Sequence, residues 1–86
     1  MHVDFTKGFN KQFEKLPRKS QERAKAAVKL FLQNIKAPSL RIHALKGEWL
    51  CYHSVSAGGD IRLHFKKINQ NTVLFVAVGS HSQLYK

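Results

Sequence analysis

The sequence predicts an α+β fold in which N-terminal helices cover one side of a sheet built by the second half of the chain. Two observations predict it: apolar residues recur at helical spacing in the Lys-rich first half, and with strand periodicity in the second half. A chain of 86 residues is too short to divide its hydrophobic core. We therefore expect a single domain over residues 1–86.

The first half predicts two helices. Residues 2–6 favour a short strand, and Phe9, Phe13 and Leu16 then follow at spacings of four and three, on one face of a helix. Pro17 ends this helix. A second helix, running to about residue 35, has a longer apolar stripe made by Ala24, Val28, Phe31, Leu32 and Ile35. Its other face is rich in Lys and Arg, so we expect a helical hairpin with a cationic outer surface.

The second half predicts three strands. Residues 49–55 favour a strand, and residues 56–60, with two glycines, favour a turn. Residues 61–68 alternate between apolar and polar side chains, which indicates one core face and one basic face. Residues 73–78 are an unbroken apolar run, typical of an interior strand covered on both faces. The remaining residues, 79–86, are expected to form a polar tail.

The charge of the chain predicts a polyanionic partner. Fifteen Lys and Arg against five Asp and Glu give a formal net charge of +10. Nucleic acid, an anionic membrane surface and an acidic protein segment would all attract this charge. The single cysteine excludes an internal disulfide, and no apolar run is long enough for a signal peptide or a membrane span. We expect a cytoplasmic protein without a membrane role.

Seven residues of the second half can move protons or bind phosphate. They are His43, Lys46, His53, Asp60, Arg62, His64 and His81. Cleaving RNA without a metal requires a base for the 2′-hydroxyl proton, an acid for the leaving 5′-oxygen, and cations for the charge of the transition state. Because residue 81 follows the last predicted strand and residues 60 and 62 begin its antiparallel neighbour, we expect His81, Asp60 and Arg62 to converge.

Four of these residues, together with Lys66, also have a structural interpretation. Arg62, His64 and Lys66 project from one face of a predicted strand, where they form either a ladder for phosphates or an ordinary solvated face. Asp60 follows two glycines, as a turn residue does, and His81 is equally compatible with a solvent-exposed loop. The residues alone leave both alternatives open.

Metal and nucleotide chemistry are not expected. The five histidines are widely spaced, and Cys51 has no second cysteine, so no zinc-binding pattern exists. The pair Gly58-Gly59 is not followed by Lys-Ser or Lys-Thr, which excludes a nucleotide-binding phosphate loop. We expect an activity that needs neither a metal nor another cofactor.

Three motifs resemble one known family. They are residues 45–49 (LKGEW) with His43 just before them, residues 59–62 (GDIR), and residues 78–85 (VGSHSQLY). In this order they resemble the RelE superfamily of bacterial toxins, and within it the YafQ-like branch. The resemblance implies a RelE/ParE-like fold, with helices packed on a small, mostly antiparallel twisted sheet. It also implies an endoribonuclease that cuts mRNA in the ribosomal A site, without a cofactor.

The resemblance also implies roles for individual residues. His81 would be the principal acid or base, Asp60 its partner and His43 a second active-site histidine. Arg62 and Lys46 would bind phosphate, and Tyr85 would orient a base. The RNA-binding surface would extend to His53, His64 and Lys66.

The chain departs from the YafQ-like pattern at one position. The branch usually has a further histidine seven residues after the motif Trp, where this chain has Ser56. His53 lies three residues earlier, and residues three apart on a strand point to opposite faces. A direct substitution of His53 for that histidine would therefore need a bulge.

Three functions compete at this stage. The motifs favour a toxin of a type II toxin-antitoxin system that cleaves translated mRNA and is inhibited by a cognate acidic antitoxin. A ParE-like toxin on the same fold would bind DNA gyrase and would not need His81. A basic nucleic-acid-binding module would use the charge alone, but it would leave the motif at residues 78–85 unexplained.

Overall fold

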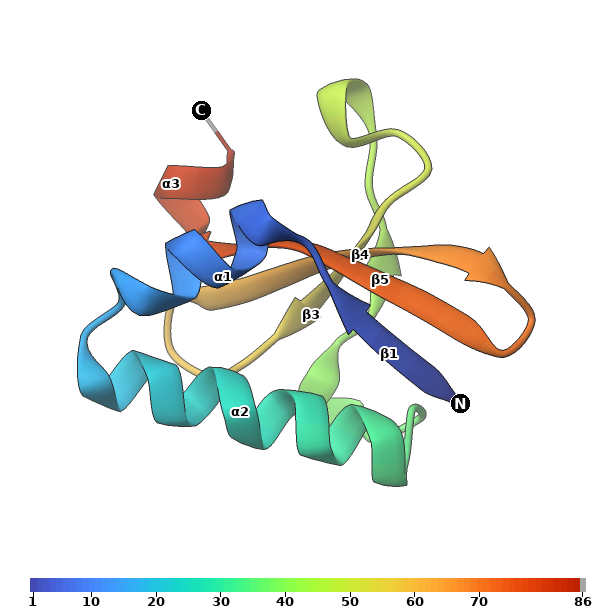
Figure 1. Cartoon of the computed structure of the whole chain (residues 1–86), viewed down its shortest axis with the longest axis horizontal. Helices are drawn as coiled ribbons and strands as arrows, with labels where there is room; N and C mark the ends of the chain where they lie inside the picture. The colour runs from blue at the N-terminus through green and yellow to red at the C-terminus, as the bar shows by residue number, and fades with distance from the viewer. Residues whose placement is uncertain (86) are drawn as a thin grey trace.

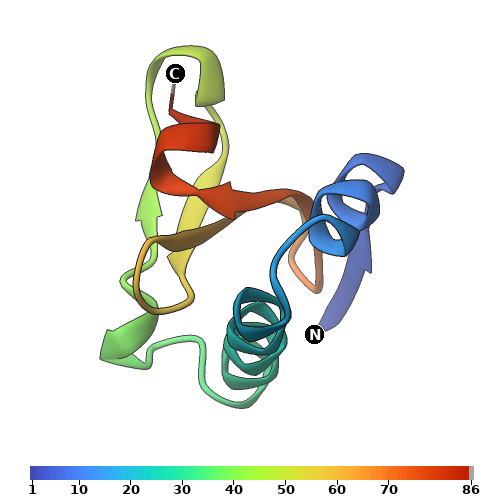
Figure 2. The same cartoon turned by 90° about the vertical axis from the view of Figure 1, so that its left-hand side faces the viewer.

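The fold is one five-stranded sheet with helices on both faces (Figures 1 and 2). The computed structural model describes residues 1–85. The strands are β1 (His2–Phe5), β2 (His43–Ala44), β3 (His53–Ser56), β4 (Ile61–Asn69) and β5 (Thr72–Ser80). The helices are α1 (Lys7–Glu14), α2 (Arg18–Gln33) and α3 (His81–Leu84), with two 3-10 turns, η1 (Pro38–Leu40) and η2 (Gly47–Trp49).

The sheet is mixed, in the order β1-β5-β4-β3-β2. Strands β2 to β5 pair antiparallel, as expected, but β1 pairs parallel with β5, with Val3 opposite Val73. A parallel pairing needs a long crossover, and here nearly the whole chain lies between the two strands. The apolar run at residues 73–78 does form an interior strand, between β1 and β4.

The two N-terminal helices form near the predicted places. Thr6 caps α1 by accepting a hydrogen bond from the Phe9 N–H (3.0 Å), and Pro17 precedes the first residue of α2. Helix α2 ends at Gln33, two residues before the expected end, because the backbone of Asn34 is no longer helical. The predicted hairpin is not confirmed as an arrangement: α1 packs mainly on β5, whereas α2 packs on β4.

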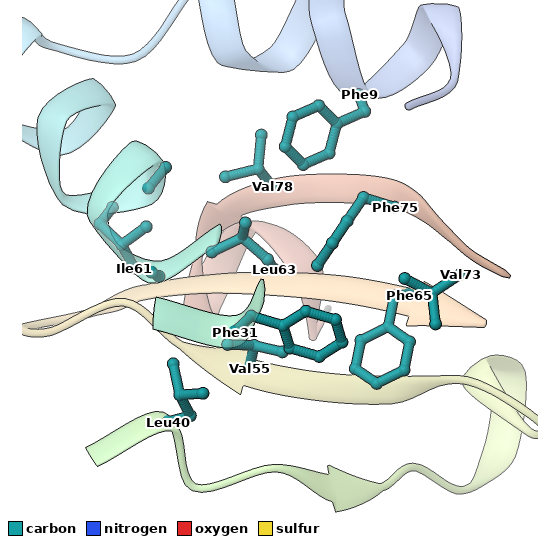
Figure 3. Packing of buried hydrophobic residues seen from close by; sticks show 12 residues of the cluster. Phe9, Phe31, Leu40, Val55, Ile61, Leu63, Phe65, Val73, Phe75 and Val78 are labelled. Atoms are coloured by element: carbon teal, nitrogen blue, oxygen red, sulfur yellow. The ribbon is translucent and has the colours of Figure 1, made fainter. Parts of the chain in front are cut away.

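A cluster of aromatic rings joins these helices to the sheet (Figure 3). The ring of Phe75 on β5 lies 6.1 Å from Phe9 of α1, 5.4 Å from Phe31 of α2 and 5.5 Å from Phe65 of β4. Phe31, Phe65 and Phe75 are each no more than 1% exposed. The sheet face toward α1 and α2 therefore packs into the hydrophobic core of the molecule.

A β-bulge explains why β5 is apolar throughout. His64 pairs with Ala77, but the next residue, Phe65, pairs with Phe75, so Val76 is skipped. The shift lets Phe75 and Val78 both point into the core, and it leaves Ala77 on the opposite face beside His64. That opposite face is covered by α3 and by the loop before β3 (Figure 2).

Two predictions for the second half are wrong. Residues 49–52 are not part of a strand: the chain forms η2 and a turn, and β3 begins only at His53. The expected polar tail is also structured, because β5 runs to Ser80 and Leu84 of α3 is buried. Ser80 and Gln83 form a capping box that starts α3. Trp49 holds the two segments together by donating from Nε1 to the Leu84 carbonyl (3.0 Å).

Within residues 1–85, no helix has the length and apolar character needed to cross a membrane.

Candidate active site

A cavity of about 340 Å³ opens on the sheet face opposite α2, between β2, the ends of β3 and β4, and α3. Its lining residues are Arg41, His43, Leu45, Ser56, Arg62, His81 and Tyr85. The sequence singled out four of them for chemistry: His43, Arg62, His81 and Tyr85. These four come from three separate parts of the chain, and the fold brings them together.

The strand register explains why these side chains share a face. His43 on β2 pairs with Ser54 on β3, and Ser54 pairs with His64 on β4. Two residues further along, Ser56 pairs with Arg62. Because directly paired residues point to the same face, His43, Ser56 and Arg62 all project away from the core.

His43 is oriented by a backbone carbonyl. Its Nδ1 lies 2.9 Å from the carbonyl oxygen of Arg41, which can only accept a hydrogen bond, so Nδ1 bears the hydrogen. In the neutral ring, Nε2 then has a free lone pair. The side chain is exposed and lines the cavity, so Nε2 is available to take a proton from a bound molecule.

Arg62 provides a fixed positive charge. Its Nη1 donates to the carbonyl oxygens of Gly59 (3.0 Å) and Ile61 (2.9 Å), which holds the guanidinium against the turn before β4. The remaining guanidinium N–H groups make no hydrogen bond within residues 1–85 and can bind an anion in the cavity.

His81 opens α3 and lies beside Tyr85. Its backbone N–H donates to the carbonyl of Asp60 (2.9 Å), which ties α3 to the start of β4. Its exposed ring lies 4.4 Å from the Tyr85 ring, at an angle of 35°. The expected convergence thus holds for His81 and Arg62, but Asp60 contributes its backbone, and its exposed carboxylate does not line the cavity.

The prediction of a row of basic side chains on an open face of β4 is wrong for the middle residue, His64. His64 is fully buried, under Trp49 and Tyr85, so it cannot lie on an open RNA-binding face. Burial and the nearby His43 lower the pKa of His64 to about 4, so the ring is neutral at pH 7. Lys66 lies outside the cavity, with Nζ 5.9 Å from the Tyr52 ring.

Two further residues proposed for RNA binding lie elsewhere. His53 points to the core face and stacks on Phe65, with ring centroids 5.2 Å apart. It therefore does not occupy the place of the histidine that the family pattern puts at position 56, where Ser56 lines the cavity. Lys46 is exposed next to η2 and outside the cavity lining.

Arg41 is a site residue that the sequence analysis missed. Arg41 lines the cavity, and its carbonyl orients His43. Its backbone has a φ of +46°, a left-handed conformation that is rare outside glycine. The only sequence signal was a basic residue two positions before His43, on a segment predicted to be a connection.

Within the described residues 1–85, no group of three or more His, Cys, Asp or Glu side chains is close enough to hold a metal ion. The polar groups of the cavity are two arginines, two histidines, a serine and a phenol. Such a set can bind an anion and move protons on and off it.

A model of one family matches residues 1–86, and its description is "Bacterial toxin of type II toxin-antitoxin system, YafQ". The chain belongs to the YafQ family. It is a toxin of a type II toxin-antitoxin system, and the resemblance seen in the three sequence motifs is confirmed. No curated protein matches the chain.

Solved structures similar to this YafQ-family toxin share its fold. YafQ from Escherichia coli is 17% identical with a TM-score of 0.81, over 98% of this chain and 97% of that one. The toxin in the Escherichia coli DinJ-YafQ complex is 18% identical with a TM-score of 0.77, over 98% and 96%. The RelB-RelE complex of Methanococcus jannaschii gives 23% identity and a TM-score of 0.66, over 96% and 95%.

Proposed function

We propose that this toxin is an endoribonuclease that cuts translated mRNA in the ribosomal A site, with residues 1–86 acting as one catalytic domain in the cytoplasm. One observation supports the proposal above all others. Two histidines, His43 and His81, line the same cavity as two arginines, Arg41 and Arg62. Acid-base cleavage of a phosphodiester needs this combination of proton carriers and fixed cations.

The proposed reaction is a transfer within the RNA strand. Nε2 of His43 takes the proton of a 2′-hydroxyl, whose oxygen attacks the adjacent phosphorus. The bond from phosphorus to the 5′-oxygen breaks, and protonated His81 donates its proton to that oxygen. Arg62 and Arg41 stabilise the negative charge on the phosphoryl oxygens. The products are a 2′,3′-cyclic phosphate and a 5′-hydroxyl end, and the four residues named supply both proton transfers and the positive charge.

Other residues have supporting roles in this proposal. Asp60 positions His81 through its backbone carbonyl, and the Tyr85 ring offers a surface on which a base can stack. Lys46 and Lys66, outside the cavity, bind flanking phosphates of the mRNA or ribosomal RNA. His53, on the core face, has no direct part in the reaction.

We further propose that an acidic antitoxin inhibits the toxin. DinJ-YafQ and RelB-RelE are solved as complexes of an antitoxin with its toxin. The net charge of +10 on this chain favours an acidic partner, since like-charged partners repel. Binding of such a segment would also neutralise the cations that the proposed reaction needs.

The test is expression of the wild type and His81→Ala in bacteria, with primer extension on an abundant mRNA. We expect growth arrest and new, codon-phased 5′ ends with the wild type, and neither with His81→Ala. His2→Ala is the matched control, because His2 is an exposed histidine on β1 whose ring bonds Asp4. Growth arrest without new ends in either strain would instead favour ParE-like binding of gyrase. Salt-sensitive RNA binding without cleavage would favour a simple binding module.

Replacing Arg41 with glycine is expected to weaken substrate binding about 10-fold, since one charged hydrogen bond to phosphate is lost. Glycine retains the carbonyl that orients His43, and it tolerates the φ of +46°. The measurement is KM for cleavage, with Lys29→Gln on the exposed face of α2 as a control for net charge. Equal effects of the two substitutions would mean that Arg41 acts only through overall charge.

A further inference from the structure

We propose that His64 is a positioning residue of this site: its buried imidazole fixes the Tyr85 phenol, and Tyr85 in turn fixes the ring of His81. The inference rests on the proposed ribonuclease function, in which His81 is the acid. It assigns His64 a role through contacts inside the protein in place of contact with RNA.

The position of His64 excludes direct contact with a substrate. It is 0% exposed, in the middle of β4, with Ser54 beside it on β3 and Ala77 beside it on β5. The indole of Trp49 covers it edge to face, with ring centroids 4.3 Å apart at 81°. A histidine that is this well enclosed needs a hydrogen-bond partner within the protein.

Tyr85 is the partner of one ring nitrogen, Nε2, while within residues 1–85 the buried Nδ1 has none. His64 Nε2 lies 3.0 Å from the Tyr85 hydroxyl oxygen, which closes a link between β4 and the residue that follows α3. Trp49 strengthens the same link, because its Nε1 donates to the carbonyl of Leu84, the residue before Tyr85. Two hydrogen bonds from the sheet side thus hold the end of a helix of only four residues.

The hydrogen bond between His64 and Tyr85 affects the orientation of His81 through the Tyr85 ring. Within residues 1–85, the His81 side chain makes no hydrogen bond, and its ring contact is the Tyr85 ring at 4.4 Å. A hydrogen bond at the phenol selects one orientation of the Tyr85 ring and so limits the orientations that His81 can adopt. Since His64 is neutral at pH 7, it adds no positive charge near Arg62.

The experiment removes the hydrogen bond between His64 and Tyr85 by replacing each of its two partners in turn. Tyr85→Phe removes one oxygen, and His64→Phe keeps an aromatic ring under Trp49. We expect each variant to lower kcat for cleavage about 10-fold, with the double variant no worse than either single one, because a shared hydrogen bond is lost once. Tyr52→Phe is the matched control and is expected to cleave at the wild-type rate. Thermal melts establish that each variant is folded.

A second measurement reports the geometry itself. The ring current of Tyr85 shifts the NMR signals of the His81 ring, and we expect this shift to shrink in Tyr85→Phe and His64→Phe but not in Tyr52→Phe. Wild-type kcat in folded Tyr85→Phe, additive losses in the double variant, or an unchanged His81 signal would overturn the inference. If the wild type does not cleave RNA, the proposed function fails, and the NMR signal still decides whether His64 positions His81.

Discussion

Replacing His43 with asparagine is expected to slow cleavage at pH 7 by about 10²–10⁴-fold, the usual contribution of a general base. The substitution is chosen for its geometry. The asparagine amide can still donate to the Arg41 carbonyl, as Nδ1 of His43 does at 2.9 Å, but it has no nitrogen that takes a proton. The measurement is single-turnover cleavage of mRNA on programmed ribosomes.

The pH profile distinguishes a lost base from a distorted site. A reaction with one base and one acid gives a bell-shaped profile, and the rise on its acidic side reports deprotonation of the base. We expect His43→Asn to lose this rise and to keep the fall on the alkaline side. His2→Asn, far from the cavity on β1, controls for loss of a histidine as such. A profile of unchanged shape in His43→Asn would mean that another group is the base.

Local patterns predicted most elements of this fold. The spacing of Phe9, Phe13 and Leu16 placed α1, and the alternation after residue 61 placed β4 almost to the residue. Such patterns fail where the structure depends on distant partners. The parallel pairing of β1 with β5 joins residues about seventy positions apart, and nothing in the sequence of either strand encodes it.

The prediction for the His64 side chain failed for the same reason, because its burial depends on residues that are distant in the sequence. The alternation of apolar and polar residues correctly placed His64 on the same face of β4 as Arg62 and Lys66. That face was predicted to be basic and open, but at His64 it is covered by other parts of the chain. The cover comes from Trp49 in a loop and from Tyr85 after α3. The capping box of Ser80 and Gln83 was visible in the sequence as a helix start, and the expectation of a polar tail overlooked it.

The candidate site was predicted in part, because its motifs resemble a family. His43, Arg62, His81 and Tyr85 were named from the sequence, and they line one cavity. Arg41 was missed because its contribution depends on a left-handed backbone that turns its carbonyl toward His43. No residue-type pattern marks such a conformation when the residue is not glycine or asparagine.

Acidification from pH 6.5 to pH 4 is expected to destabilise the protein by about 3 kcal/mol through His64 alone. The unfolded chain protonates this histidine near its ordinary pKa of 6.5, whereas the folded protein does so only near a pKa of about 4. Between these values the unfolded state binds more protons, so stability falls as the pH falls. Well above pH 6.5 the histidine is neutral in both states, and the full stability is present.

The surroundings of His64 explain why a positive charge on its ring is unfavourable. Its burial removes water, and His43 adds a like charge when protonated, while Arg62 and Lys66 flank it on β4. Both ion pairs among residues 1–85, His2–Asp4 and Arg18–Glu22, are exposed, so each contributes little to stability. Urea unfolding across pH 4–7 measures the effect, and His64→Phe, folded at pH 7, is expected to lose most of the slope. A wild-type slope in that variant would assign the acid sensitivity to other groups and would contradict a buried, neutral His64.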